Sequence, residues 1–119
     1  MEYREEVVGV DWVELKQTLQ LDHFDNGRSP DQLRESFGSS YAVCLAYLNG
    51  RIVGTARALS DGVCNAYIVD VWTLSTHRNQ GIGTAMVRRL LSRLVGQHVY
   101  LAAEDALPFY RSLGFTEDG

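Results

Sequence analysis

One stretch constrains the fold more than any other: an apolar strand pattern that passes through two glycines into an amphipathic helix. The segment NAYIVDVWTL (65–74) is followed by STHRNQGIG (75–83) and TAMVRRLL (84–91). Ile82, Met86, Leu90 and Leu94 recur every four residues, as on the buried face of a helix. The first turn carries no acid, although helix N-termini expose unpaired N–H groups and a partial positive charge. This pattern predicts a strand–loop–helix unit whose loop is open to an anionic group.

The other segments predict one domain over residues 1–119 with a mixed α/β sheet. Asp11 and Ser29-Pro30 are N-terminal signals of two short helices, and Asn49-Gly50 is a strong hairpin signal between two β-favouring runs. HVYLAA (98–103) predicts a later strand, and EDALPFYRSLGF (104–115) predicts a last short helix. The expected order is two helices, three strands, a helix, a strand and a helix. Such an order favours helices on both faces of one sheet.

The charge distribution bears on the class of ligand. The formal net charge is −4, which argues against a nucleic-acid-binding surface. No acid occurs from Val71 through Ala103, whereas Arg78, Arg88, Arg89 and Arg93 fall inside this window. A small polyanionic ligand fits this acid-free, arginine-bearing zone better than DNA does.

The sequence also favours a cytoplasmic protein without metal. No apolar run approaches the ~20 residues that span a bilayer. The start, MEYREEVV, is too acidic for a secretory signal. Cys44 and Cys64 lack metal-ligand spacing, and we expect both to be buried, reduced thiols.

Three phosphate-binding templates can be compared with the glycine loop. A Walker loop requires a lysine after its last glycine, but the only lysine is Lys16. The dinucleotide fingerprint would place Met86 where a glycine or alanine packs against the strand. The template R/Q-x-x-G-x-G/A is filled by residues 78–83 without a gap. Its glycines, helix N-terminus and Arg78 suit a pyrophosphate, and the alternative is a tight strand-to-helix turn.

Two motifs in this order resemble the Gcn5-related N-acetyltransferases. VDVWTLS, THRNQGIG and TAMVRRLL are similar to that family's acetyl-CoA motif, and ALPFYRSLGF is similar to its second motif. The resemblance covers the chain from about Tyr41 onward and implies a GNAT-like acyl-CoA N-acyltransferase fold. It further implies that acetyl is moved from acetyl-CoA to a primary amine of a small molecule or peptide by direct attack, without an acyl-enzyme.

The resemblance also implies roles for individual residues. The pyrophosphate would lie on the N–H groups from Asn79 to Thr84 beside Arg78, and the pantetheine arm would pair with the strand end like an added strand. The expected cofactor-binding residues are therefore Trp72, Thr73, Leu74, Arg78, Asn79, Gln80, Gly81, Ile82, Gly83, Thr84 and, in the second motif, Phe109. The N–H near Thr73 would steady the oxyanion, and Tyr110 would protonate the departing thiolate. The residue-level alternative for Tyr110 is a packed aromatic.

The general base stays open. Asp70 is a candidate because a carboxylate in an apolar strand is costly to bury, and its alternative is a hydrogen bond to backbone at a bulge. Where some relatives have a strand glutamate, this chain has Tyr67. Glu104 and Asp105 are further candidates, Asp105 being equally suited to cap the next helix. A water chain, or loss of the substrate's own proton, is the remaining alternative.

Two departures from the family's pattern leave further alternatives. Ala103 stands where many relatives have an asparagine, and FTEDG (115–119) is long enough for only one short strand where the family has two. The acceptor site is then open, covered by a partner chain as in a homodimer, or incomplete because the natural protein is longer. Acids near the N-terminal helices, Asp22, Asp25 and Glu35, favour a cationic amine, and the alternative is an ordinary solvated surface. The alternatives to an enzyme are a CoA-binding module without turnover and a nucleotide-binding regulator.

Overall fold

The computed structural model describes residues 1–101 of the 119-residue chain. The elements follow in the order β1 (Glu2–Arg4), α1 (Trp12–Leu21), α2 (Pro30–Gly38), β2 (Ala42–Leu48), β3 (Arg51–Ser60), β4 (Asn65–Thr73), the short 3₁₀ helix η1 (Ser75–His77), α3 (Ile82–Ser92) and β5 (His98–Leu101). None of these helices combines the length and apolar character that crossing a lipid bilayer requires.

The strands form one five-stranded sheet in the order β1-β2-β3-β4-β5. Neighbours are antiparallel except β4 and β5, which run parallel because α3 connects them. The hairpin between β2 and β3 turns on Asn49 and Gly50, whose φ angles are 53° and 78°. Both residue types tolerate a left-handed backbone, so the predicted hairpin is confirmed.

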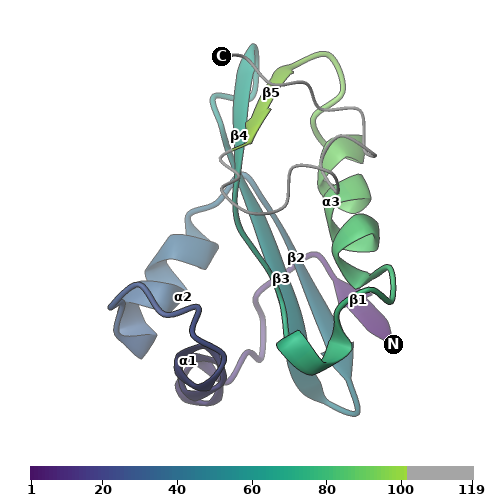
Figure 1. Cartoon of the computed structure of the whole chain (residues 1–119). Helices are drawn as coiled ribbons and strands as arrows, with labels where there is room; N and C mark the ends of the chain where they lie inside the picture. The colour runs from purple at the N-terminus through teal and green to yellow at the C-terminus, as the bar shows by residue number, and fades with distance from the viewer. Residues whose placement is uncertain (102–119) are drawn as a thin grey trace.

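Helices cover both faces of the sheet, as predicted. Figure 1 shows α3 on one side and α1 and α2 on the other. On the α3 side, Met86, Val87 and Leu90 pack against small residues of the strands, such as Ala56 and Ala66. A second core joins α1 and α2 to the opposite face of β2, β3 and β4, and its members include Leu15, Leu19, Leu33, Phe37, Leu45 and Trp72. The sheet is therefore the middle layer of three.

Side chains cap the N-termini of α1 and α2 at the positions that the sequence predicted. Asp11 accepts a hydrogen bond from the Glu14 N–H at the start of α1. Ser29 and Gln32 form a reciprocal capping box at the start of α2, with Pro30 as its first residue. These bonds satisfy N–H groups that a helix leaves without partners, and they fix where α2 begins relative to the loop before it.

A bulge interrupts β4 in the middle of the sheet. Thr55 pairs with Trp72 and Arg57 with Val69, so Asp70 and Val71 stand opposite Ala56 alone. Asp70 has a φ of 54°, and its carbonyl accepts a hydrogen bond from the buried Thr55 hydroxyl at 2.9 Å. An extra residue of this kind bends a strand and increases its twist.

The first strand was missed by the sequence analysis. Tyr3 lies half-buried on β1 beneath Arg89 of α3, whose guanidinium carbon is 4.8 Å from the ring centroid. Arg89 and Arg93 also lie 3.8 Å and 3.6 Å from Glu5 oxygens. A three-residue edge strand has too little apolar pattern to be recognised from sequence, and its pairing with β2 holds it in the sheet.

Candidate functional site

The loop into α3 presents a run of free backbone donors. Asn79 and Gly81 adopt left-handed φ angles of 63° and 80°, and Gly81 caps α3 without a side-chain hydrogen bond. Within residues 1–101, no acceptor bonds the N–H groups of residues 79–84, whereas the next N–H, of Ala85, donates to the Gly81 carbonyl at 3.0 Å. Consecutive free N–H groups at a positive helix end form a site suited to a phosphate.

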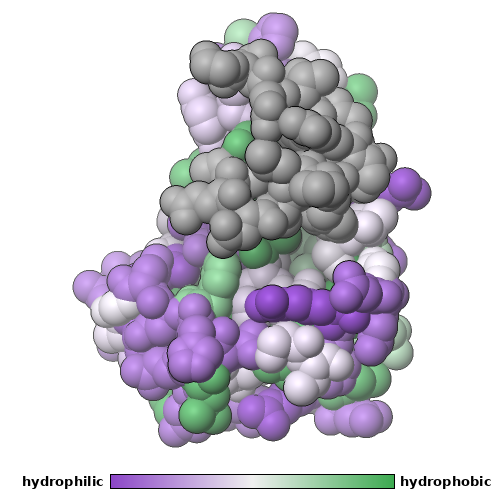
Figure 2. All heavy atoms as spheres, viewed as in Figure 1, coloured by the Kyte–Doolittle hydropathy of each residue, from purple (hydrophilic) through white to green (hydrophobic). Residues whose placement is uncertain are grey.

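Hydrophilic side chains surround this loop on the surface. Arg78, Asn79 and Gln80 are exposed, while Ile82 is buried and fixes the start of α3 in the core. In Figure 2 hydrophilic atoms gather over the connection from β4 to α3 and, separately, over α1 and α2. The loop therefore has an exposed cationic rim and a buried anchor.

Within residues 1–101, one edge of β4 lacks a partner strand beside the loop. The described pairs between β4 and β5 run from Asn65–His98 to Ile68–Leu101, and no described residue pairs with this edge of β4 beyond Ile68. The other edge stays paired with β3 as far as Thr73, opposite Gly54. Residues 102 and 103, the end of the predicted strand HVYLAA, lie outside the described part. The bulge at Asp70 lies two residues beyond Ile68, where the described β4–β5 pairing ends.

The backbone at the end of β4 has fixed partners on its β3 side. Trp72 is 2% exposed and packs in the α1–α2 core, so it can offer a ligand only its backbone. The Leu74 N–H donates to the Val53 carbonyl at 2.8 Å, and the Arg78 Nε donates to the Thr73 carbonyl at 3.2 Å. These bonds hold the strand end and the loop together.

Asp22 gathers donors from the same segment. It is the C-cap of α1, and its carboxylate accepts from the Trp72 indole N–H at 2.9 Å and from the Ser75 N–H at 3.1 Å. Both of these donors bind Oδ2 of Asp22, and the Ser75 hydroxyl donates to Oδ1. The Arg78 Nη2 lies 3.9 Å from Oδ2. Burial raises the pKa of Asp22, but the Ser75 and Trp72 hydrogen bonds and Arg78 outweigh burial and lower it below the ordinary value. Asp22 is therefore charged at neutral pH.

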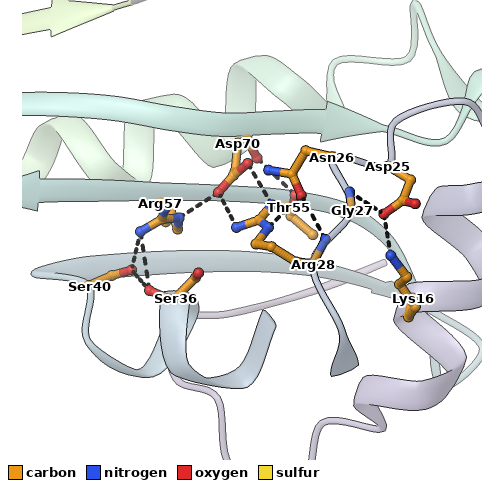
Figure 3. A network of polar contacts seen from close by, with 10 residues as sticks. All are labelled: Lys16, Asp25, Asn26, Gly27, Arg28, Ser36, Ser40, Thr55, Arg57 and Asp70. Atoms are coloured by element: carbon orange, nitrogen blue, oxygen red, sulfur yellow. Dashed lines mark hydrogen bonds and ion pairs between the residues drawn. The ribbon is translucent and has the colours of Figure 1, made fainter. Parts of the chain in front are cut away.

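Asp70 lies in a second polar network on the α1–α2 side of the sheet (Figure 3). Arg28 binds both of its oxygens, through Nη1 at 3.0 Å and Nη2 at 2.9 Å, and the Arg57 Nε donates to it at 2.6 Å. The Arg57 Nη1 also donates to the Ser36 carbonyl at 3.1 Å and to the Ser40 hydroxyl at 3.3 Å. The network ties the loop before α2, α2 itself and β3 to the bulge of β4.

This environment makes Asp70 a weak base. Its side chain is 14% exposed, and burial alone would raise its pKa. The Arg28 and Arg57 guanidiniums outweigh burial and lower the pKa below its ordinary value. The sequence analysis offered a free catalytic carboxylate or one bonded to backbone at a bulge. The bulge is present, but the carboxylate binds two arginines instead of the backbone.

Arg28 and Arg57 were missed as site residues. Arg28 belongs to the polar loop LDHFDNGR, where a single arginine reads as solvated surface, and Arg57 interrupts the apolar strand β3. The available signal was the pairing of two rare features, an arginine in one central strand and an aspartate in the next. Such residues are costly to bury alone and so are expected to pair across a sheet.

Other predicted site residues have mixed outcomes. Glu104, Asp105, Phe109 and Tyr110 lie outside the described residues. Cys44 is buried, as expected, and burial raises the pKa of its thiol to about 11, whereas Cys64 is exposed, which corrects the expectation. Cys64 precedes β4 at the end opposite the glycine loop. Among residues 1–101, no group of three or more His, Cys, Asp or Glu side chains is placed to hold a metal ion.

A depression lies beside Arg28 on the α2 side. It has a volume of about 490 Å³ and is lined by Asn26, Gly27, Arg28, Gln32, Glu35, Ser36 and Ser39. Of the three acids expected near the acceptor, Glu35 alone borders it: Asp22 is buried in its own network, and Asp25 is paired with Lys16. Every lining residue is polar or glycine, so this depression suits a hydrophilic group.

Comparison with known proteins places residues 8–115 on the model of the acetyltransferase (GNAT) family. GCN5-related N-acetyltransferase 3, chloroplastic, of Arabidopsis thaliana is 37% identical over 81 residues, which are 65% of this chain and 34% of that protein. Serotonin N-acetyltransferase 2, chloroplastic, of Oryza sativa subsp. japonica is 37% identical over 99 residues, 76% of this chain and 50% of that protein. The chain thus spans between a third and a half of the length of these two curated relatives.

Solved structures share the fold. A candidate acetyltransferase of Deinococcus radiodurans R1 superposes with a TM-score of 0.84 and 26% identity, over 99% of this chain and 83% of that one. An aminoglycoside 6'-N-acetyltransferase complexed with coenzyme A has a TM-score of 0.80 and 19% identity, over 100% of this chain and 87% of that one. At this identity the second similarity shows the fold alone, and that fold neighbour was solved with coenzyme A bound.

Proposed function

The chain belongs to the acetyltransferase (GNAT) family, and on that premise we propose that it transfers the acetyl group of acetyl-CoA to a primary amine. The attack is direct, without an acyl-enzyme. Of the cysteines that could carry an acyl group, Cys44 is buried with a raised pKa, and Cys64 lies beyond the opposite end of β4 from the loop.

The observation that carries this proposal is the run of N–H groups from Asn79 to Thr84, beside Arg78, that have no acceptor among the described residues 1–101. We assign the pyrophosphate of acetyl-CoA to this run, because charge-assisted bonds to backbone N–H groups and to a guanidinium are stronger than neutral ones. Gly81 and Gly83 allow the close approach, and Thr84 and Ile82 begin the helix whose dipole adds positive potential.

The pantetheine arm then lies along the available edge of β4. The backbone at Trp72, Thr73 and Leu74 would pair with its amides as an added strand does, apart from the Leu74 N–H, which already donates to the Val53 carbonyl. This assigns the thioester to the neighbourhood of the bulge, where an N–H near Thr73 steadies the negative charge on the carbonyl oxygen. The amine nitrogen forms the new bond to the acetyl carbon, the carbon–sulfur bond breaks, and the thiolate leaves with a proton.

Proton transfer requires an acid and a route for the amine's proton. We assign the acid to Tyr110 on the resemblance of its motif, and Phe109 to the cofactor. An amine with a pKa near ~10 must lose a proton before it attacks. Asp70 was predicted for this step, but two guanidiniums hold its pKa low, and we assign it to positioning the bulge instead. Glu104, Asp105 or a water chain then carries the proton.

The acceptor enters from the side of α1 and α2. Glu35 borders the polar depression there, and a cationic amine is the acceptor class that its carboxylate favours. Relatives carry names for different acceptors, among them serotonin and histone, and a fold neighbour is named for aminoglycosides. These names span small molecules and proteins, so the acceptor of this chain is proposed only as a class: a cationic primary amine.

Two further proposals concern the protein's location and its assembly. A cytoplasmic location remains our prediction for this chain, whereas the names of several relatives place those proteins in the chloroplast. A homodimer in which a second chain covers the acceptor side remains our prediction for its assembly. Both points stay predictions.

The test is release of CoA thiol from acetyl-CoA in the presence of a panel of primary amines. We expect turnover with at least one cationic amine, and a Tyr110→Phe variant that binds CoA normally but turns over at least about tenfold more slowly. Unchanged turnover in that variant would remove Tyr110 as the acid. CoA binding with no turnover on any amine would favour the alternative, a CoA-binding module without catalysis.

A further inference from the structure

We propose that Asp22 is a positioning residue of the cofactor site, holding the end of β4, η1 and Arg78 in the arrangement that receives the pyrophosphate. This inference rests on the proposed function, because it concerns the same loop. It differs from the role that the sequence suggested for Asp22, an acid near the acceptor amine.

The first argument is where the partners of Asp22 come from. Asp22 ends α1, on the opposite side of the sheet from α3, yet its four contacts all go to residues 72–78. They involve Trp72 at the end of β4, both donors of Ser75 in η1, and Arg78 at the start of the loop. One carboxylate thus fixes three successive parts of the connection that leads to the free N–H groups.

The second argument is burial. The Asp22 side chain is 8% exposed, and a buried carboxylate is costly unless donors surround it. A tight turn by itself does not need a buried charge, since a neutral acceptor could bond the Ser75 N–H. The charge has a specific partner in Arg78, whose side chain is 58% exposed and so keeps one side of its guanidinium open to a ligand.

The third argument is that charge and position predict opposite effects. A negative charge beside an anion site weakens anion binding through simple Coulomb repulsion. If Asp22 instead anchors Arg78, together with the Thr73 carbonyl that accepts from Arg78 Nε, it strengthens binding by reducing the freedom that the ligand must remove. The sign of the effect therefore separates the two roles.

The experiment is calorimetric titration of CoA into the wild type, Asp22→Asn, Arg78→Gln and the double variant. Asparagine keeps an oxygen for Trp72 and Ser75 but removes the charge that holds Arg78. We expect Asp22→Asn to weaken CoA binding by about tenfold, and the double variant to bind only slightly more weakly than Arg78→Gln alone, because contacting residues couple. Asp31→Asn, at a side chain that is 88% exposed, is the charge-matched control and should leave binding unchanged.

Several outcomes overturn the inference. Equal or tighter CoA binding by Asp22→Asn contradicts positioning, as do effects that multiply in the double variant. A lower unfolding midpoint with unchanged CoA affinity assigns Asp22 to stability alone. Should Asp22→Asn not fold, Ser75→Ala removes one donor to the same carboxylate and is expected to weaken CoA binding by about threefold, with no change overturning the idea. Wild-type protein that binds no CoA overturns the proposed function itself.

Discussion

At the scale of single residues, Asp70 illustrates how a buried charge is stabilised. Arg28 binds it with both nitrogens of its guanidinium fork, the geometry that suits a carboxylate best, and Arg57 completes the network. Both guanidiniums also lie near the Phe37 ring, with their central carbons 6.0 Å and 5.7 Å from its centroid. Removing the carboxylate leaves two cations without a counterion in a largely buried place, which costs more than the pair itself contributes.

We therefore expect Asp70→Asn to lower the free energy of unfolding by about 2–4 kcal/mol at pH 7. The folded-state pKa of Asp70 is depressed, so its stabilisation is present above the unfolded pKa and is lost as the pH falls through the folded one. In urea titrations from pH 7 downward, the difference between variant and wild type should shrink below about pH 4. A difference that persists there, or an equal loss in exposed Asp31→Asn, would contradict the ion-pair account.

The same variant separates positioning from base catalysis. If Asp70 is not the base, the pH–rate profile of folded Asp70→Asn should show the same apparent pKa values as that of the wild type, even if the rate itself falls. Loss or displacement of the limb that reports the base would return Asp70 to the catalytic role predicted from its strand position.

At the scale of elements, the connection from β4 to α3 combines two left-handed residues with free donors. A Cβ at Gly81 would meet no atom within 4 Å, so space does not require glycine there. The φ of 80° does, because other residues rarely adopt that conformation. The N–H groups on either side depend on this angle for their direction.

We therefore expect Gly81→Ala to lower the free energy of unfolding by about 1–2 kcal/mol. The loss in the free energy of CoA binding should be larger than this loss of stability. Gly38→Ala is the matched control: Gly38 ends α2, has no atom within 4 Å of a built Cβ, and has no left-handed φ. Chemical denaturation gives the stability change and calorimetry the CoA affinity. Equal behaviour of the two alanine variants would show that the left-handed turn is not what shapes the phosphate site.

At the scale of the whole molecule, the two faces of the sheet differ in their polar contacts. Both faces carry an apolar core, and the α1–α2 face also holds the polar networks of Asp22 and Asp70. The Asp22 network joins α1 to the end of β4, and the Asp70 network joins α2 to its bulge, so buried charges link the proposed acceptor side to the proposed cofactor strand. Such links are expected to set the relative position of the two substrates.

Local patterns made much of this architecture predictable. The four-residue repeat of Ile82, Met86 and Leu90 and the Asn49-Gly50 turn are signals contained in short segments, and the structure follows them. The edge strand β1 and the partners of Asp70 are not, because they depend on residues far apart in sequence. Arg28 and Asp70 are separated by 42 positions, and their pairing can be recognised only once the folded sheet brings them together.

The most direct test of the account is thermal unfolding with acetyl-CoA, CoA, NAD and ATP, each far above a micromolar dissociation constant. A ligand at a hundred times its Kd adds ~2.7 kcal/mol, which raises the midpoint of a domain of this size by several degrees or more. We expect a rise with acetyl-CoA and CoA alone, and none with NAD or ATP. No rise with either CoA species, or an equal rise with NAD or ATP, would contradict the assignment of the glycine loop to acetyl-CoA.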